Sequence, residues 1–378
     1  MNDDDLHSCK SAHRAHRDGV EDGLTPLTTL DVGAASDIDE LLAGMALTSF
    51  GGRNLGEAAE VLEEMVTDPD CTVVLTLSGA MTVAKMNLVI VEMIERGWVQ
   101  AIVSTGALMT HGLVELAGMQ HFKASKKMDD KSLFEQGYNR VYDTYEPEQN
   151  LNDLSELLHK VFEGMPKDRR WGSRELLHEI GRFLEPTGRR GIMSTCFKHG
   201  VPVYVPAFTD SELALDMATS FLHWTINRNP DAELDELLTG LQTPFDPFID
   251  LAHITRVVSR SPKMGIVTIG GGVPRNWAQQ VPPFLDIINV RLGKEEAVRR
   301  YEYGVRICPE PVHWGGLSGC TYSEGVSWGK FLPVEEGGRY SEVYADATIA
   351  WPILVKAVGQ RLDKAGRRGV SPDLKLGD

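Results

Sequence analysis

A repeated alternation of apolar strands and helices constrains this fold more than any other feature of the sequence. The β-branched run Cys71–Leu77 is followed by small residues at 78–80 and then by a helical pattern to about residue 95. A second apolar run at 99–103 is followed by another turn of small residues and another helix. Such units predict an α/β fold with a doubly wound, mostly parallel Rossmann-like sheet flanked by helices. Ligands of such folds bind at the carboxyl ends of the strands.

The rest of the chain continues this alternation of strands and helices, with less distinct apolar runs. Residues 123–149 are charged and predict an irregular surface segment, and Gly265 begins a strand that ends in three glycines. The further predicted helices are 38–49, 55–65, 151–164, 173–184, two pieces within 231–260 and 352–365, and the further strands are 201–205, 305–308 and 343–346.

Composition excludes several classes of function. A net charge of −16 disfavours a nucleic-acid partner and suits a cationic ligand. The five cysteines are far apart without a CxxC pair, and the eleven histidines show no HxH or HxxxH spacing. We therefore expect neither a disulfide framework nor a metal site. No apolar run has the length of a membrane span, and the N-terminus is polar, so we expect a cytoplasmic protein without a membrane partner.

The stretch 314–330, WGGLSGCTYSEGVSWGK, combines five glycines, two tryptophans, Glu324 and the terminal Lys330. Tryptophan usually packs or stacks on a flat or cationic group, which a plain solvated loop does not require. A partly desolvated lysine beside it would have a lowered pKa and a nucleophilic amine. A turn-rich connection before a strand is the alternative interpretation.

Six short sequence blocks, which occur in the same order as in the family, resemble the deoxyhypusine synthase family, most closely its archaeal and bacterial branch. They are LTLSGAMTVA (75–84), IVSTGALMTHGLVE (102–115), GYNRVYD (137–143), VPVYVPAFTDSELALD (201–216), TIGGGVP (268–274) and GVSWGK (325–330). The resemblance spans about residues 41–366. It implies a single NAD-binding catalytic domain (37–366). The polar, mixed-charge stretch 1–36 predicts a flexible N-terminal arm leading into a first helix, and the residues beyond the domain predict a disordered tail (367–378). The resemblance also implies a homotetramer with its sites at subunit interfaces.

The resemblance implies NAD-dependent transfer of an aminobutyl group from a polyamine such as spermidine to an acceptor amine. In the family, a lysine in the position of Lys330 carries the group as an imine, and the acceptor is a hypusine-type translation factor. The matching polyamine-binding positions are Glu324, Trp328, Asp143, Asp216 and Asn276. The matching cofactor-binding positions are Asp346, Ala347, Ser78, Thr105, Asp210, Gly270, Gly272 and Ser318. Trp328 could instead serve packing, Asp210 could be only a helix cap, and the match at Asp216 is shared with Glu212.

Two departures from the family pattern concern the substrate ends. Eukaryotic enzymes have a histidine where this chain has Asn276 followed by Trp277, and an aspartate where it has Leu317. The donor, the acceptor or both can therefore differ. The alternatives are synthesis of homospermidine or of a guanidino-polyamine with a small amine acceptor, with Trp314 or Trp277 stacking on a guanidinium, and a non-catalytic activating paralogue. Retention of Lys330 argues against the paralogue, and a plain NAD dehydrogenase would not use the lysine.

Overall fold

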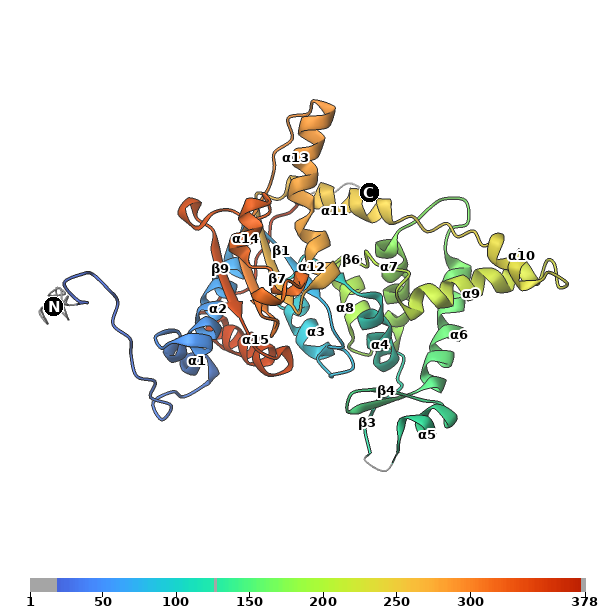
Figure 1. Cartoon of the computed structure of the whole chain (residues 1–378), viewed down its shortest axis with the longest axis horizontal. Coiled ribbons are helices and arrows are strands. Elements are labelled where there is room, and N and C mark those ends of the chain that lie inside the picture. The colour runs from blue at the N-terminus through green and yellow to red at the C-terminus, as the bar shows by residue number, and fades with distance from the viewer. Residues whose placement is uncertain (1–18, 126–127, 375–378) are drawn as a thin grey trace, which may run out of the picture.

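The computed structural model of the chain describes residues 19–125 and 128–374, and a six-stranded sheet forms its centre (Figure 1). All neighbouring strands are parallel. Their order is β6 (Val203–Tyr204), β2 (Ala101–Ser104), β1 (Cys71–Leu77), β7 (Lys263–Ile269), β8 (Tyr301–Ile307) and β9 (Arg339–Val343). This confirms the predicted doubly wound α/β fold.

The strand order reverses direction between β1 and β7. The chain moves outward from β1 through β2 to β6, returns beside β1 as β7, and continues to β8 and β9. Leu77 pairs with both Ser104 and Ile269. The next residue of each strand, Ser78, Thr105 and Gly270, therefore lies at the same carboxyl edge. In open α/β sheets this reversal is the place where ligands bind.

Alternating side chains of the strands build two cores, one on each face of the sheet. Val73 and Leu75 belong to the larger core, whereas Val74 and Ile266 belong to the smaller one. Helices contributing to the larger core include α1 (Ile38–Ala46), α2 (Phe50–Thr67), α3 (Asn87–Glu95), α4 (Gly106–Leu116), α8 (Ile192–His199) and α15 (Ala347–Lys364). Those contributing to the smaller core are α11 (Pro247–Arg260), α12 (Gly272–Gln279), α13 (Val281–Leu292) and α14 (Tyr322–Ser327).

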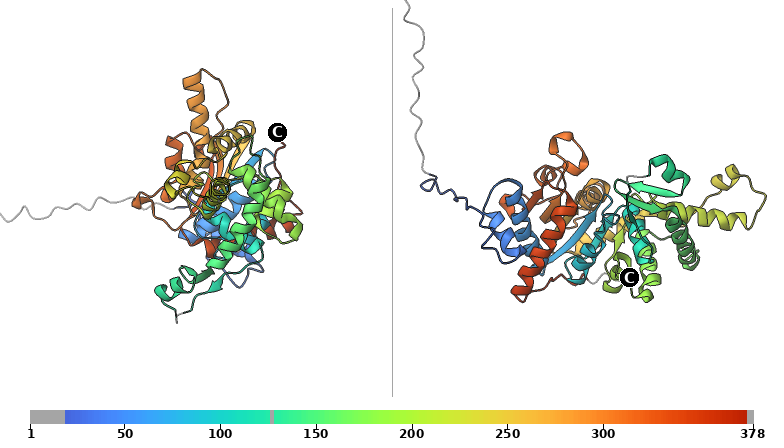
Figure 2. Two further views of the ribbon diagram at one scale, coloured as in Figure 1. Left: turned by 90° about the vertical axis from the view of Figure 1, so that its right-hand side faces the viewer. Right: turned by 90° about the horizontal axis from the view of Figure 1, so that it is seen from below.

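Further helices extend the molecule beyond the β6 edge of the sheet (Figures 1 and 2). They are α6 (Glu148–Gly164), α7 (Ser173–Leu184), α9 (Glu212–Ile226) and α10 (Leu234–Thr239). Among the described helices, none combines the length and the hydropathy that crossing a bilayer requires.

The charged segment after α4 is more regular than the sequence predicts. It forms a three-stranded antiparallel sheet, β3 (Phe122–Lys123), β5 (Thr144–Pro147) and β4 (Tyr138–Val141), with the short helix α5 (Asp130–Glu135). Tyr145 is buried, and its hydroxyl donates to the carbonyl of Ser125 at 2.8 Å. The prediction of an irregular segment is thus wrong. The strands are too short to show periodicity in the sequence, and the buried Tyr145 anchors them.

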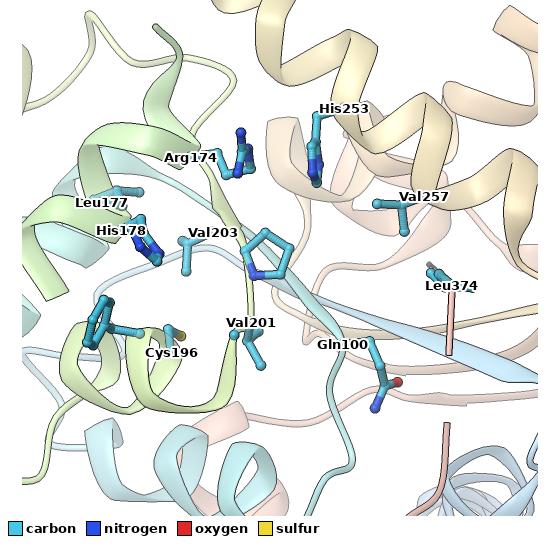
Figure 3. Close-up of a pocket in the computed structure, with 13 residues that line it drawn as sticks. Gln100, Arg174, Leu177, His178, Cys196, Val201, Val203, His253, Val257 and Leu374 are labelled. Atoms are coloured by element: carbon cyan, nitrogen blue, oxygen red, sulfur yellow. The ribbon is translucent and has the colours of Figure 1, made fainter. Parts of the chain in front are cut away.

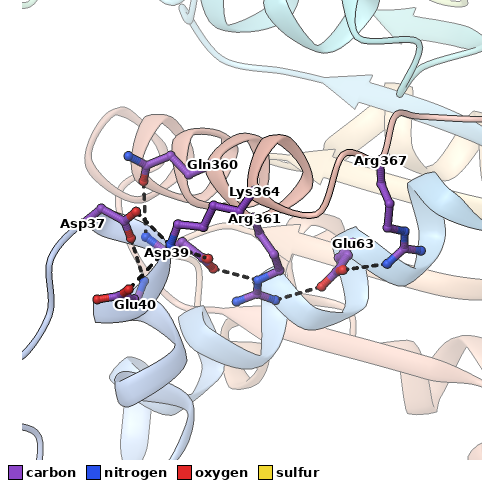
Figure 4. A network of polar contacts seen from close by, with 8 residues as sticks. All are labelled: Asp37, Asp39, Glu40, Glu63, Gln360, Arg361, Lys364 and Arg367. Carbon is purple, nitrogen blue, oxygen red and sulfur yellow. Dashed lines mark hydrogen bonds and ion pairs between the residues drawn. The ribbon is translucent and has the colours of Figure 1, made fainter.

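Polar contacts join the two ends of the described chain (Figure 4). Arg361 of α15 donates from Nε to Asp39 at 2.7 Å and from Nη1 to Glu63 at 3.1 Å, which links α15 to α1 and α2. Beyond α15, Arg367 donates to Glu63 at 2.9 Å, and the Val370 amide donates to a carbonyl of α2 at 2.9 Å.

The predicted boundaries at 36 and 366 stay predictions. Residues 1–18 of the expected arm and 375–378 of the expected tail lie outside the described residues.

Candidate active site

Helix α14 and the turn after it fix the position of Lys330. Thr321 caps the helix, its Oγ1 accepting from the Glu324 amide at 3.0 Å. Gly329 has φ of 69°, a left-handed conformation that glycine adopts without steric cost and that turns the chain out of the helix. The carbonyl of Lys330 then accepts from the Tyr301 amide at 3.0 Å, at the start of β8. The GVSWGK motif therefore attaches Lys330 to the central sheet.

Lys330 lies at the base of a pocket of about 330 Å³. The residue is 7% exposed, and its Nζ donates to Asn276 Oδ1 at 3.0 Å. Burial lowers the pKa of Lys330, and the positive charge of Arg275 adds to this effect, whereas Cys320 and Glu324 oppose it. The pocket is lined by Asn276, Gln280, Val312, Gly315, Gly316, Leu317, Cys320, Glu324, Trp328 and Lys330. It can therefore hold a lysine amine that loses its proton more readily than usual.

Two buried arginines that sequence reasoning missed support the wall of this pocket. Arg306 of β8 donates to the Ser318 carbonyl at 2.6 Å and to Glu342 at 2.6 Å. Arg275 of α12 reaches the carbonyls of Leu317 and Ser318 at 3.4 Å each. A charge between the apolar residues Val305 and Ile307 was the only sequence signal for Arg306. Together they hold the short 3-10 turn Leu317–Gly319 against the sheet.

Large apolar side chains form an exposed rim around the pocket. Trp328 is 65% exposed, with Lys330 Nζ 5.8 Å from its ring centroid, which allows an alkyl or cationic chain to lie on its face. Leu317 is 45% exposed, and Trp314, which is 71% exposed, precedes the lining residue Gly315 but does not itself line the pocket. Trp277, by contrast, packs against Tyr204 with the two rings tilted by 43° and their centroids 5.6 Å apart, and it lies outside this pocket, so the stacking role considered for it has no support here.

Three of the five predicted polyamine-binding residues come together with Lys330, namely Asn276, Glu324 and Trp328. Asp143 instead lies exposed in the turn between β4 and β5, outside this pocket. Asp216 faces Ser155 of α6. Burial raises the pKa of Asp216 to about 6; a hydrogen bond from Ser155 opposes the shift, and the charge of Glu212 adds to it. Within one described chain, these two acids are not part of the pocket.

The predicted cofactor residues gather along the carboxyl edge of the sheet. At the strand reversal, Ser78 Oγ accepts from the Gly271 amide at 2.7 Å. A Cβ on Gly271 would lie 2.4 Å from Ser318 Cα, so only glycine allows this approach. Gly270 and Gly272 have φ of 77° and 68°, and a Cβ at Gly272 would meet no atom within 4 Å. The backbone is thus open at the start of α12, as a nucleotide pyrophosphate requires.

The remaining cofactor candidates sit at helix starts along the same edge. Thr105 caps α4, and Asp346 caps α15 through Oδ1, which accepts from the Thr348 amide and hydroxyl at 2.7 Å each. Ala347 is the first, buried residue of α15. Asp210 is exposed beside Ser211, and Ser211 rather than Asp210 occupies the N-cap position of α9. The helix-cap interpretation of Asp210 is therefore wrong.

A second cavity of about 270 Å³ lies at the opposite edge of the sheet (Figure 3). Its lining includes Gln100 and Val201, which precede β2 and β6, and His253 of α11. Burial lowers the pKa of His253 to about 4, with the charges of Arg174 and Arg256 adding to the shift. Since neither Lys330 nor a predicted cofactor residue lines it, this cavity is separate from the candidate site.

The fold and the site define a doubly wound α/β protein with an open glycine backbone at the strand reversal and a partly desolvated lysine beside it. The model of the deoxyhypusine synthase family matches residues 40–358. The chain belongs to the deoxyhypusine synthase family, which is a family of transferases.

Relatives with similar sequences agree with this assignment. "Probable deoxyhypusine synthase 2" of Methanosarcina acetivorans is 34% identical over 89% of this chain and 90% of its own length. A "Deoxyhypusine synthase-like protein" of Chlorobaculum parvum is 33% identical over 85% of this chain and 86% of its own. A crystal structure of a candidate deoxyhypusine synthase from Entamoeba histolytica shares the fold, with a TM-score of 0.56 at 15% identity over 93% of this chain and 100% of its own.

Proposed function

We propose that this protein is an NAD-dependent aminobutyl transferase that carries the transferred group on Lys330. The observation that supports this most directly is the position of the Lys330 amine, which is buried, held by Asn276 and lowered in pKa. Family membership supports aminobutyl transfer in general. The proposal adds the lysine intermediate, the cofactor and the substrates.

Lys330 and the side chains around it would have separate roles in the reaction. The neutral amine attacks the carbon of an oxidised polyamine, and the Lys330 C–N bond forms as 1,3-diaminopropane leaves. Glu324 holds an ammonium end of the polyamine, and Trp328 covers its alkyl chain. The acceptor amine then displaces Lys330, which restores the free lysine.

NAD would bind along the strand reversal, on Ser78, Gly270, Gly272 and Ser318. When bound, it would accept a hydride from the polyamine and return it to the product. Asp346, at the start of α15, would accept hydrogen bonds from ribose hydroxyls. This carboxylate favours NAD over NADP, whose 2′-phosphate it would repel.

The residues that would bind the ends of the substrate favour a small amine over a translation factor as the acceptor. Among the described residues that line the pocket, Glu324 is the one carboxylate, and Leu317 stands where eukaryotic family members have an acid. Within the pocket of one chain, a donor with two ammonium ends therefore lacks a carboxylate partner for one of them. We propose homospermidine or guanidino-polyamine synthesis as the second candidate, with the exposed Trp314 next to the pocket available to stack on a guanidinium.

A second copy of the chain would complete the site. Asp143 and Asp216 match family polyamine positions but lie outside the pocket of one chain, and the rim tryptophans Trp314 and Trp328 are exposed. We propose a homotetramer with sites at subunit interfaces and a dimer as the smallest active form. Light scattering of the active protein tests this, and a fully active monomer would refute it.

Trapping of the intermediate tests the chemical proposal. Borohydride is added during turnover with NAD and spermidine, and the labelled peptide is identified by mass spectrometry. We expect an aminobutyl adduct on Lys330, and no adduct or turnover in Lys330→Arg.

Lys167 provides a matched control, since its pKa is also lowered by burial and its Nζ lies 3.9 Å from the ring centroid of Trp224. Lys167→Arg should keep the adduct. Turnover that persists in Lys330→Arg would rule the mechanism out.

A further inference from the structure

Three side chains with metal-binding atoms meet where helix α4 contacts the small sheet. His111 lies on α4, His121 just before β3, and Glu146 on β5. His111 Nδ1 is 2.7 Å from Glu146 Oε2, and His121 Nε2 is 3.3 Å from Glu146 Oε1. One ligand atom of each residue lies within 4.8 Å of the other two. The group is separate from the Lys330 pocket.

The cluster is largely buried, and its facing atoms have only one another as polar neighbours. Glu146 is 1% exposed, the His121 side chain is fully buried, and the His111 side chain is 21% exposed. Within residues 19–125 and 128–374, His111 Nδ1, His121 Nε2 and Glu146 Oε1 make no well-aligned hydrogen bond beyond these imidazole–carboxylate contacts. Buried polar atoms almost always have one, so three that converge on one point indicate a shared partner.

The position of Glu146 suits a cation. Its carboxylate is buried between two imidazoles, and a carboxylate inside a protein requires a cationic or hydrogen-bonding partner, which a metal ion can supply.

We propose that His111, His121 and Glu146 bind one divalent transition-metal ion of the zinc type. Two imidazoles and one carboxylate are a known three-residue zinc set, with a water as the fourth ligand. Magnesium and calcium prefer oxygen ligands throughout, so they fit this set poorly. Zinc bonds of about 2.0–2.1 Å place tetrahedral ligand atoms about 3.3 Å apart, which small side-chain rotations would achieve here.

Lys85 competes with the ion from the other side of His121. Its Nζ lies 2.9 Å from His121 Nδ1 and also pairs with Glu115. An ammonium that donates to Nδ1 leaves the imidazole proton on Nε2, directed at Glu146. Metal binding at Nε2 would require the tautomer that carries the proton on Nδ1, which would break the hydrogen bond from Lys85, and Lys85 would keep Glu115 as its partner. Removal of the Lys85 amine should therefore tighten metal binding.

The ion would act as a clamp between two segments. It would join α4, whose first turn lies at the carboxyl edge of the main sheet, to β5, three residues after Asp143. This role is independent of the proposed transferase chemistry, and its tests do not use activity.

Metal titration of the untagged full-length protein tests the proposal. After treatment with a chelator, Co²⁺ is added and its visible absorption is followed, and Zn²⁺ is then used as competitor. We expect one ion per chain, tetrahedral Co²⁺ bands and a higher melting temperature with Zn²⁺. His121→Asn and Glu146→Gln should each weaken binding at least about tenfold, and Lys85→Met should strengthen it.

His159→Asn is the matched control, because His159 also faces a glutamate, Glu163, at 3.5 Å but on the surface. It should bind the ion as wild type does. Absence of a stoichiometric ion in the wild type, or equal weakening in His159→Asn, would overturn the proposal and leave a metal-free ion-pair cluster. If a ligand variant fails to fold, metal content of wild-type protein purified without chelator decides the question.

Discussion

Burial lowers the pKa of the proposed nucleophile Lys330, and its contact with Asn276 adds no charge that would oppose this shift. An amide oxygen 3.0 Å from Nζ accepts a hydrogen bond without adding charge. Burial is therefore only weakly opposed, and the pKa of Lys330 stays below its ordinary value. The eukaryotic histidine at this position can change its charge near neutral pH, whereas Asn276 cannot.

The first prediction is that Asn276→Asp moves the rise of activity with pH to higher values. The neutral amine attacks, so the trapping rate rises as pH passes the pKa of Lys330. A carboxylate beside the ammonium raises that pKa, and trapping at a fixed lower pH slows in proportion to the lost fraction of neutral amine. The pH profile of borohydride trapping at saturating donor measures this. Asn276→Ala, which adds no charge, should show no upward movement of the profile, and an unmoved profile in Asn276→Asp would count against the assignment.

A second residue-scale prediction concerns Leu317→Asp. The side chain lines the pocket but is 45% exposed, so a carboxylate there would be screened by solvent. Exposed ion pairs contribute about 0.2–1 kcal/mol, which corresponds to a KM for spermidine lower by up to about fivefold. Steady-state kinetics measures it.

Val312→Asp, on the same rim, is the control for general charge. An equal gain in both variants would contradict a specific contact at position 317.

At the scale of elements, the approach of the start of α12 to the Leu317–Gly319 turn joins the cofactor side to the lysine side. We predict that Gly271→Ala weakens NAD binding at least about tenfold, because its Cβ would meet the backbone of Ser318 at 2.4 Å. Gly271 has φ of −178°, so the effect is steric and not conformational. Calorimetric titration with NAD measures it.

Gly337→Ala provides the comparison, since φ of 107° strains an alanine in open space far from this contact in sequence. It should lower stability and leave NAD affinity unchanged. Equal NAD affinity in wild type and Gly271→Ala would place the cofactor elsewhere.

The predictable elements were those with strong apolar runs. Strands β1 and β7 followed from continuous apolar runs, and helices α6 and α7 followed from the helical spacing of their apolar residues. Strands β3 to β5 are two to four residues long, too short for any periodicity. Helix α15 begins at Ala347, five residues before the predicted start at Pro352, because Asp346 caps it and the proline is tolerated inside.

The candidate site depended on resemblance more than on spacing. Composition left Lys330 open between nucleophile and loop residue, and only the six blocks assigned it a role. Arg275 and Arg306 were missed because each acts through a contact distant in sequence. The metal-ligand cluster was missed, and a metal site was expected to be absent, because its residues lie 10 and 25 positions apart, outside the short motifs searched.

At the scale of the whole molecule, the ion pairs of Arg361 hold the first and last helices together (Figure 4). We predict that Arg361→Ala lowers the free energy of unfolding by about 1–3 kcal/mol, because Asp39 and Glu63 lose a partially buried partner. The melting temperature should fall by several degrees.

Arg182→Ala is the surface control, because Arg182 pairs with Glu179 while 60% exposed. It should change stability by no more than about 0.5 kcal/mol. Similar losses of unfolding free energy in both variants would show that the contact between the first and last helices stabilises the fold no more than a surface ion pair does.

The pairing of β1 with β7 also has a consequence during synthesis on the ribosome. These two strands lie side by side, yet Cys71 pairs with Lys263, about 190 residues later in the chain. At a synthesis rate of about 5–20 residues per second, roughly 10–40 s pass between the synthesis of β1 and that of its second neighbour, β7. During that interval one edge of a strand that is fully buried in the native fold has no native partner. The nascent chain therefore passes through a period of exposure to aggregation, in which chaperone binding to its first half would matter most.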